Sequence, residues 1–177
     1  MRDPRDRPVR IRPGHGDDLV ALTAIYNHYV RATAVTFDVA EFSIDARRAW
    51  VDSHAERGRY RLLVAEVDGS AIGWASSGTY RARAAFETTV ETAVYLAPGE
   101  TGRGIGTTLY GALFESLEGE DVHRAVAAIT LPNEASVRLH RRLGFTAVGR
   151  FSESGRKFGR FWDVLWMERP VGAARRT

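Results

Sequence analysis

The stretch that decides the fold is GETGRGIGTT at residues 99–108, here called the glycine loop. It follows the apolar run ETAVYL (91–96) and leads into IGTTLYGALFESL (105–117), in which apolar residues recur at helical spacing. Glycines at alternate positions let the backbone approach a ligand closely. The first N–H groups of a helix have no partner inside the helix, and with the helix dipole they attract phosphate. The stretch therefore predicts a strand, a phosphate-binding loop and a helix in succession.

Two familiar phosphate loops do not fit the glycine loop. It has no lysine, which excludes the GxxxxGK[ST] pattern. The spacing G-R-G-I-G does not match GxGxxG, and the next strand, AVAAIT (125–130), carries no acidic residue for a ribose. A pyrophosphate cradle of another kind, built from main-chain donors, remains. The alternative is that the glycines serve only the turn.

The rest of the chain predicts alternating strands and helices. The expected elements are strand 9–12, helix 17–32, helix 43–57 capped by Ser43, strands 61–67 and 71–80 around an Asp68-Gly69 hairpin turn, strand 87–96, a helix from 105, strand 125–130, helix 133–143 stopped by Gly144, and strands 145–151 and 161–169. This order predicts an α/β fold with a mixed, mostly antiparallel central sheet flanked by helices.

Composition indicates one globular domain. Of 177 residues, 44% are hydrophobic and 27% charged, which suits a single domain over 9–171 with flexible ends at 1–8 and 172–177. No run of about 18 apolar residues and no secretory signal occurs, so we expect a cytoplasmic protein without a membrane partner. The absence of cysteine excludes disulfides and a covalent cysteine enzyme, and we expect no metal. The net charge of +3 forms no basic stripe, so we expect no nucleic-acid partner.

Several segments resemble one known family. TGRGIG (101–106) resembles the (Q/R)xxGxG/A loop of the GNAT superfamily of acyl-CoA-dependent N-acetyltransferases. The collinear segments IYNHYVRATAVTFD (25–38), VETAVYLAP (90–98), LPNEASVRLHRRLGF (131–145) and KFGRFWDV (157–164) resemble its phosphinothricin N-acetyltransferase group. The resemblance covers residues 9–171 and implies the GNAT fold with acetyl-CoA as co-substrate. One departure is Thr101, which stands where the family has Gln or Arg, with Arg103 two residues later.

The resemblance also implies how the co-substrate is held. Main-chain groups of Val94, Tyr95 and Leu96 are expected to pair with the pantetheine amides like an added strand. The pyrophosphate is expected on Thr101, Gly102, Arg103, Gly104, Ile105, Gly106 and Thr107. Asn133 is expected to hydrogen-bond the pantetheine arm, and it also fits a helix N-cap.

Two residues are candidates for proton transfer. An ammonium ion is not a nucleophile, so acetylation of an amine needs a positioned base. Glu91 is an acid inside an apolar strand and matches the glutamate that the phosphinothricin group uses as base, although a solvated sheet face is the alternative. His140 matches a histidine of that group where many GNAT enzymes carry a proton-donating tyrosine. A histidine satisfied in the core is the alternative there, and the direction of proton transfer stays open.

The implied substrate is a small glutamate-like amino acid, acetylated on its α-amine by direct attack on the thioester. Phosphinothricin, methionine sulfoximine and methionine sulfone are the analogues that the resemblance suggests. Arg83 matches an arginine of the group and is expected to bind the acidic end, with Phe37 and Tyr95 as pocket walls; an exposed arginine and aromatic core packing are the alternatives. A homodimer is expected. Acetylation of another amine (a peptide N-terminus, lysine or drug) and a CoA-binding module without catalysis remain open.

Overall fold

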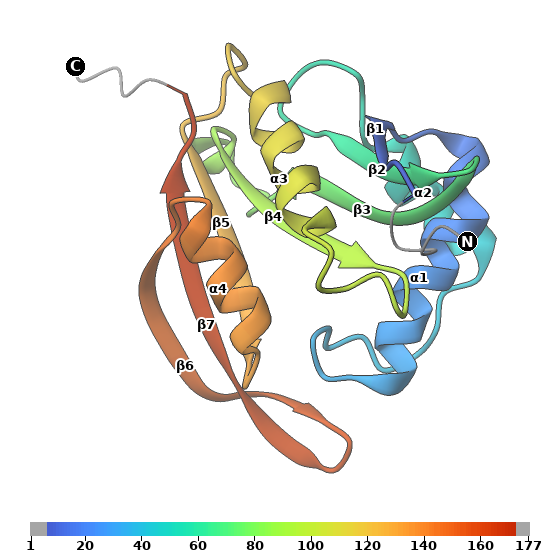
Figure 1. Ribbon diagram of the computed structural model, residues 1–177. Coiled ribbons are helices and arrows are strands. Elements are labelled where there is room, and N and C mark those ends of the chain that lie inside the picture. Colours follow the sequence, from blue (N-terminus) through green and yellow to red (C-terminus); the bar gives the residue numbers. More distant parts are fainter. Residues whose placement is uncertain (1–6, 173–177) are drawn as a thin grey trace.

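A computed structural model describes residues 7–172 of the chain. These residues form one seven-stranded sheet in the order β1-β2-β3-β4-β5-β7-β6, with helices on both faces (Figure 1). The elements are β1 (Arg10–Pro13), α1 (Leu19–Ala32), α2 (Ile44–Asp52), β2 (Leu62–Val67), β3 (Ser70–Thr79), β4 (Thr89–Leu96), α3 (Ile105–Ser116), β5 (Arg124–Leu131), α4 (Glu134–Arg142), β6 (Thr146–Lys157) and β7 (Arg160–Pro170), with 3-10 helices η2 (Gly16–Asp18) and η3 (Ala84–Phe86). The predicted α/β fold and element order are confirmed. Of the ends predicted to be flexible, 1–8 and 172–177, residues 1–6 and 173–177 lie outside the described residues.

The sheet changes character between β4 and β5. These two strands form its parallel pair, and every other neighbouring pair is antiparallel. Their register runs only from Thr89 opposite Arg124 to Glu91 opposite Val126. Beyond Glu91 the two strands diverge, as Figure 1 shows. Over residues 92–96, the edge of β4 that faces β5 therefore has no strand beside it, and an opening forms in the middle of the sheet.

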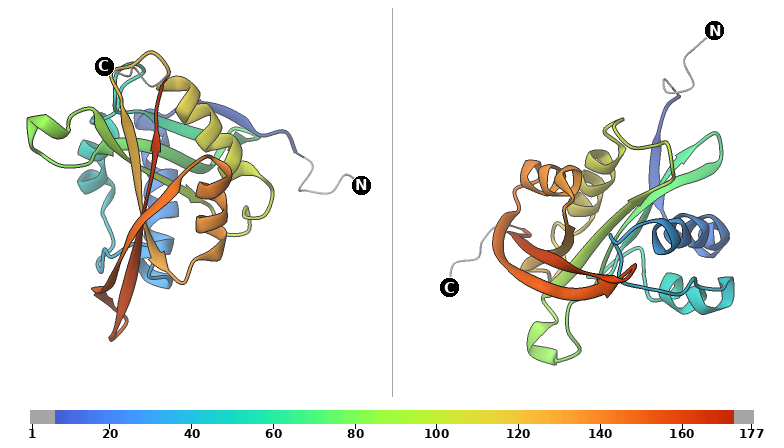
Figure 2. Two further views of the ribbon diagram at one scale, coloured as in Figure 1. Left: turned by 90° about the vertical axis from the view of Figure 1, so that its left-hand side faces the viewer. Right: turned by 90° about the horizontal axis from the view of Figure 1, so that it is seen from below.

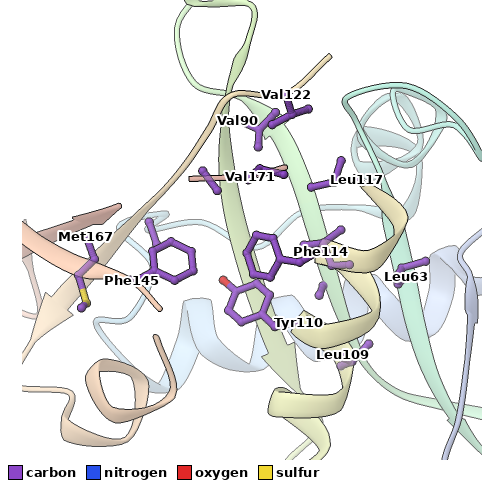
Figure 3. Packing of buried hydrophobic residues seen from close by; sticks show 14 of the residues in the cluster. Leu63, Val90, Leu109, Tyr110, Phe114, Leu117, Val122, Phe145, Met167 and Val171 are labelled. Atoms are coloured by element: carbon purple, nitrogen blue, oxygen red, sulfur yellow. The ribbon is translucent and has the colours of Figure 1, made fainter. Parts of the chain in front are cut away.

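Two apolar clusters hold the helices to opposite faces of the sheet. On one face, α3 packs into the larger cluster through fully buried side chains such as Leu109, Tyr110 and Leu113 (Figure 3). On the other face, α1 and α2 pack over Val64 and Trp74. Figure 2 shows the sheet between the two helix pairs, α3 with α4 and α1 with α2. Within the part of the chain that is described, no helix is long and apolar enough to cross a membrane.

Element boundaries differ from the prediction in three places. Helix α2 ends at Asp52 instead of residue 57, because the His54 ring nitrogen Nδ1 bonds the Trp50 carbonyl (2.7 Å) and caps the helix. Strand β4 begins at Thr89 because η3 occupies the residues just before it. Strands β6 and β7 are longer than predicted and meet at a two-residue turn, Phe158-Gly159, in which both φ angles are positive (53° and 74°).

Candidate active site

The opening between β4 and β5 continues into a cleft of about 1020 Å³. Its lining comes from both helix pairs, the glycine loop, and the strands on either side of the opening. One part is bordered by main chain of β4 and the glycine loop. The other part is bordered by aromatic side chains from α1, α2, β3 and β4. The cleft thus has a backbone-rich slot joined to a side-chain pocket.

The glycine loop has the geometry of an anion cradle. Gly102 (φ 80°) and Gly104 (φ 78°) are left-handed, a conformation that side-chain-bearing residues avoid, and Gly104 is the N-cap of α3. A Cβ at either position would meet no atom within 4 Å, so the space beside them is open. Their N–H groups donate to no main-chain carbonyl of the described chain. These donors at a helix N-terminus fit a pyrophosphate.

Gly106 and the two side chains at the start of the loop have different surroundings. A Cβ on Gly106 would lie 3.3 Å from Leu139 Cδ2, so this glycine allows α3 to approach α4 closely. Arg103 forms an ion pair with Glu100, which partly neutralises its charge beside the loop. Thr101 is exposed and lines the cleft. The anion cradle therefore depends on main chain more than on side-chain charge.

The free edge of β4 offers only some of the main-chain groups expected to bind pantetheine. The Ala97 N–H donates to Ile72 O (2.8 Å), and because alternate residues of an antiparallel strand face the same neighbour, Tyr95 also faces β3. Val94 and Leu96 then face the opening. The Leu96 carbonyl accepts a hydrogen bond from Tyr29 Oη (2.7 Å). Val94 therefore directs both its main-chain groups into the slot and Leu96 its N–H, while Tyr95 contributes its side chain to the cleft.

Glu91 is the last residue of β4 that pairs with β5, so its side chain lies where the strands part. It is half-buried and lines the cleft. Burial raises the pKa of its carboxyl group above the ordinary glutamate value. This carboxylate forms no hydrogen bond or ion pair with any residue between 7 and 172. A half-buried carboxylate with raised pKa and without a structural partner has the properties of a general base.

His140 and Tyr110 form a buried pair under the cleft wall. His140 Nδ1 bonds the Ser136 carbonyl (2.8 Å), which places the ring proton on Nδ1 and leaves Nε2 as an acceptor. Tyr110 Oη lies 3.2 Å from Nε2 and donates to it. Figure 3 shows the Tyr110 ring between α3 and Phe145 with its hydroxyl directed away from the helix. Burial lowers the pKa of His140, so the ring is neutral at neutral pH.

Asn133 combines two roles in one side chain. Its Oδ1 accepts a hydrogen bond from Ser136 N–H (3.1 Å), so the predicted N-cap of α4 is confirmed. The residue also lines the cleft. Because the cap uses only Oδ1, the amide Nδ2 donors stay available for a ligand.

Of the three residues predicted to bind the substrate, two line the cleft and one does not. Phe37 and Tyr95 line the aromatic part of the cleft. Arg83 does not: it is exposed at the N-cap of η3, in the β3–β4 connection that turns away from the opening, and it is absent from the cleft lining. The prediction that Arg83 binds the acidic end of the substrate therefore has no support within one described chain.

Several residues that line the cleft were not predicted from the sequence, and three of them bear on its chemistry. Arg47 of α2 is buried and lines the aromatic part, together with Trp74 of β3. Tyr110 lies at helical spacing among core residues, a pattern that indicates packing alone. In ARRAW (46–50) the arginine at 47 cannot be told from its neighbour, and only the contact of α2 with the sheet separates them. Trp74 gave no signal beyond its place in a buried strand.

Comparisons with known proteins agree with this geometry. A family model described as Acetyltransferase (GNAT) family matches residues 22–145. A phosphinothricin N-acetyltransferase from Streptomyces coelicolor is 55% identical over 170 residues, covering 95% of this chain and 99% of that protein. An L-methionine sulfoximine/L-methionine sulfone acetyltransferase from Pseudomonas paraeruginosa is 37% identical over 158 residues, covering 89% of this chain and 92% of that protein.

A solved structure shows the same architecture with a ligand. An acetyltransferase from Salmonella typhimurium, solved with its cofactor acetyl-CoA, superposes with a TM-score of 0.88 at 35% identity, over 95% of this chain and 96% of that one. The family match spans α1 to α4 and so includes the diverging strands, the glycine loop and the histidine helix that build the cleft. The chain therefore belongs to the acetyltransferase (GNAT) family and is an acyltransferase.

Proposed function

We propose that this chain transfers an acetyl group from acetyl-CoA to the α-amine of a small glutamate-like amino acid. The observation that carries the proposal is Glu91, an unpartnered half-buried carboxylate placed between a backbone slot and an aromatic pocket. The names of the relatives support the substrate class, because they include phosphinothricin and methionine sulfoximine/methionine sulfone N-acetyltransferases.

The residues of the slot fit acetyl-CoA. The N–H groups of Gly102, Gly104 and Gly106 at the start of α3 are suited to the pyrophosphate. The main chain of Val94 and the amide of Asn133 are suited to the pantetheine arm. When bound, acetyl-CoA supplies the thioester carbonyl that the amine attacks.

Glu91 prepares the amine for this attack. An α-amine of pKa about 8 is mostly protonated at pH 7, and freeing it costs about 1.4 kcal/mol per pKa unit. The Glu91 carboxylate, directly or through a water, takes that proton. Because the pKa of Glu91 is raised, it lies closer to pH 7 than the pKa of an ordinary glutamate. The carboxylate is therefore a stronger base while it stays ionised. With no cysteine in the chain, attack is direct and no cysteinyl intermediate forms. The amine nitrogen bonds to the thioester carbon, the C–S bond breaks, and CoA leaves as a thiolate that takes up a proton from solvent.

His140 acts as a proton acceptor in this proposal. A neutral ring with its proton on Nδ1 has nothing to donate from Nε2. Nε2 instead accepts a hydrogen bond from the Tyr110 hydroxyl. When Tyr110 Oη takes up a proton from the reaction, the tyrosine passes its own hydroxyl proton to Nε2. The open direction of proton transfer is assigned in this way.

The aromatic pocket favours a small substrate over a protein chain. Lys157 Nζ of β6 donates to Thr36 O (2.8 Å), which ties the hairpin of β6 and β7 to the α1–α2 connection. The Phe37 ring lies so close to Gly155 that a Cβ there would be 2.3 Å away. This contact packs the hairpin against Phe37, which lines the pocket, and it favours a small substrate, because a peptide or protein substrate needs an open groove.

An amine panel tests the proposal. Release of CoA from acetyl-CoA is measured with phosphinothricin, methionine sulfoximine, methionine sulfone, a lysine peptide, a peptide N-terminus and an aminoglycoside. We expect turnover with the first three. Turnover confined to the peptides or the drug would replace the substrate class, and binding of CoA without any turnover would make the chain a non-catalytic CoA-binding module.

We also propose that the chain pairs with a second copy of itself. Four large apolar side chains of the β6–β7 hairpin region are more than half exposed: Val148, Phe151, Phe158 and Phe161. Strand β6 is an edge strand, so the same region also offers unpaired backbone groups. Sedimentation at micromolar concentration is expected to give a dimer, and a single species near 19.7 kDa would contradict the pairing.

A further inference from the structure

Arg47 lies in surroundings that are unusual for a charged side chain. It belongs to α2, is 7% exposed, and contributes to the lining of the cleft. Aromatic rings surround its guanidinium: the Cζ atom lies 3.9 Å from the Trp50 ring centroid, 4.4 Å from that of Tyr26 and 5.5 Å from that of Phe42. Cation–π contacts hold the group in place but bring no negative charge to it.

The guanidinium has no hydrogen-bond acceptor. Its Nε and Nη2 atoms are buried without a partner, and no hydrogen bond or ion pair joins this side chain to any residue from 7 to 172. Burial lowers the pKa of Arg47, and the more distant Asp38 carboxylate, which favours the charged form, makes no hydrogen bond or ion pair with it. Buried cations are normally paired, because an unpaired one costs several kcal/mol of desolvation. A cation kept at such a cost beside a cleft indicates that an anion arrives from outside the chain.

A second unpartnered donor lies in the same wall. Trp74 of β3 is 2% exposed, and its indole Nε1 has no acceptor among the described residues. An indole N–H is a donor only, so it too fits an oxygen acceptor. The Trp74 and Trp50 ring centroids are 4.8 Å apart, and the Arg47 guanidinium lies over the Trp50 ring. Two donor groups without acceptors therefore border one part of the cleft.

This part of the cleft faces the proposed base. Trp74 lies opposite Tyr95 in the β3–β4 register, and Glu91 lies opposite Gly78 on the same face of the sheet. Tyr95 lies four positions after Glu91 on β4, which corresponds to about 13 Å between their Cα atoms. A small amino acid with a hydrogen bond of about 3 Å at each end fits this span, its amine toward Glu91 and an anionic group toward Arg47.

We propose that Arg47, assisted by the indole N–H of Trp74, binds an oxyanion of the amino-acid substrate. The oxyanion is either the α-carboxylate or the acidic group at the end of the substrate's side chain, and both have the oxygen acceptors that these donors lack. This inference rests on the proposed function, because it assigns the anion subsite of the same acetylation reaction. It places that subsite on α2 and β3 instead of at Arg83.

The test compares three amine substrates at saturating acetyl-CoA. Phosphinothricin carries two anionic groups, methionine sulfone carries only its α-carboxylate, and the α-amide of methionine sulfone carries none. KM and kcat are measured for the wild type and for Arg47→Met, which removes the charge but keeps much of the side-chain volume. Arg48→Met is the matched control, because Arg48 is the next residue of α2, is exposed, and within residues 7–172 forms an ion pair with Asp45 alone (3.9 Å).

Loss of a charged hydrogen bond predicts a KM that is roughly 10- to 100-fold higher for Arg47→Met. If the α-carboxylate is bound, KM rises for both acids and not for the amide; if the side-chain group is bound, it rises for phosphinothricin alone. KM for acetyl-CoA is expected to stay unchanged. Arg48→Met is expected to behave as the wild type with all three substrates.

Stability separates binding from a structural role. Since the buried guanidinium has no acceptor, Arg47→Met is expected to keep its melting temperature within a few degrees. Should it fail to fold, Trp74→Phe, which keeps a ring but removes the N–H, and Arg47→Lys must each raise KM selectively for the anionic substrates. Equal effects on acids and amide, or a selective effect in Arg83→Met and not in Arg47→Met, would overturn the assignment. A wild type that acetylates none of the three substrates would instead refute the proposed function.

Discussion

Replacing Glu91 by glutamine separates catalysis from stability, because the carboxylate has no hydrogen-bond or ion-pair partner to lose among residues 7–172. Glutamine keeps the shape of the side chain and cannot accept the proton of an ammonium group. A positioned base contributes about 10²- to 10⁴-fold to a rate, so kcat/KM at pH 7 is expected to fall by that factor, about 3 to 5 kcal/mol of transition-state stabilisation. CoA release under steady-state conditions measures it.

The pH dependence of the defect identifies its cause. Burial raises the pKa of Glu91, so the acid limb of the wild-type kcat/KM profile is expected above the ordinary glutamate value of about 4.3. This limb is expected to vanish in Glu91→Gln. The remaining rate should rise with pH, because an amine that loses its proton to solvent no longer needs the base. A defect of the same size at pH 7 and pH 9.5 would refute the assignment of Glu91 as base.

The stability of Glu91→Gln is expected to change in the opposite direction. A raised pKa means that the folded state holds the Glu91 proton more tightly than the unfolded chain, so stability from this group is lost as pH rises through the raised value. Glu91→Gln should therefore melt at or above the wild-type temperature at pH 7.5. At pH 4 and below the two proteins should converge, since Glu91 is then protonated in both states.

A matched control and a companion variant complete the experiment. Glu87→Gln changes an exposed carboxylate four residues earlier, in contact with Arg59 (3.4 Å), and is expected to leave kcat/KM unchanged. Glu91→Asp keeps the charge but withdraws it by one methylene, and an intermediate rate is expected. Wild-type turnover of Glu91→Gln at pH 7 would exclude Glu91 as the base and leave the Tyr110–His140 pair or solvent as the proton acceptor.

Three further substitutions test other parts of the cleft. Gly104→Ala forces a side chain into φ 78°, at about 1–2 kcal/mol, and is expected to raise KM for acetyl-CoA without changing that for the amine. Gly155→Ala places its Cβ 2.3 Å from the Phe37 ring and should alter KM for the amine alone. Tyr110→Phe leaves Nε2 of His140 buried without a donor, so denaturant unfolding should show a loss of about 1–3 kcal/mol and kcat should fall. Unchanged stability of Tyr110→Phe would argue against the hydrogen bond.

Local signals predicted most of the fold. The Asp68-Gly69 turn has the two positive φ angles (49° and 77°) that this dipeptide favours, and Ser43 caps α2 through its side chain as expected. The succession of strand, glycine loop and helix follows from spacing alone. These features depend on neighbours in sequence, so a pattern can detect them.

The parts that the sequence did not predict depend on packing between distant segments. Arg47 and Arg48 are adjacent in α2, yet of the two only Arg47 contacts aromatic rings, those of Tyr26, Phe42 and Trp50, and nothing in the helical spacing distinguishes the two arginines. Arg83 was placed at the substrate by resemblance, but the direction of the β3–β4 connection carries it away from the cleft. At both positions the residue type can be read from the sequence, whereas the direction of the side chain depends on the packing of distant segments.

The two halves of the cleft have unequal freedom to change over evolutionary time. The slot presents main-chain groups, which every amino acid possesses, so substitutions there leave its donors intact wherever glycine geometry is kept. Thr101, which replaces the Gln or Arg expected in this family, illustrates that tolerance. The aromatic pocket is assembled from side chains of α1, α2, β3 and β4, each of which can mutate independently. Related proteins can therefore acquire new amine substrates while they keep acetyl-CoA as the acetyl donor. Enzymes with different amine specificities are expected to share the slot.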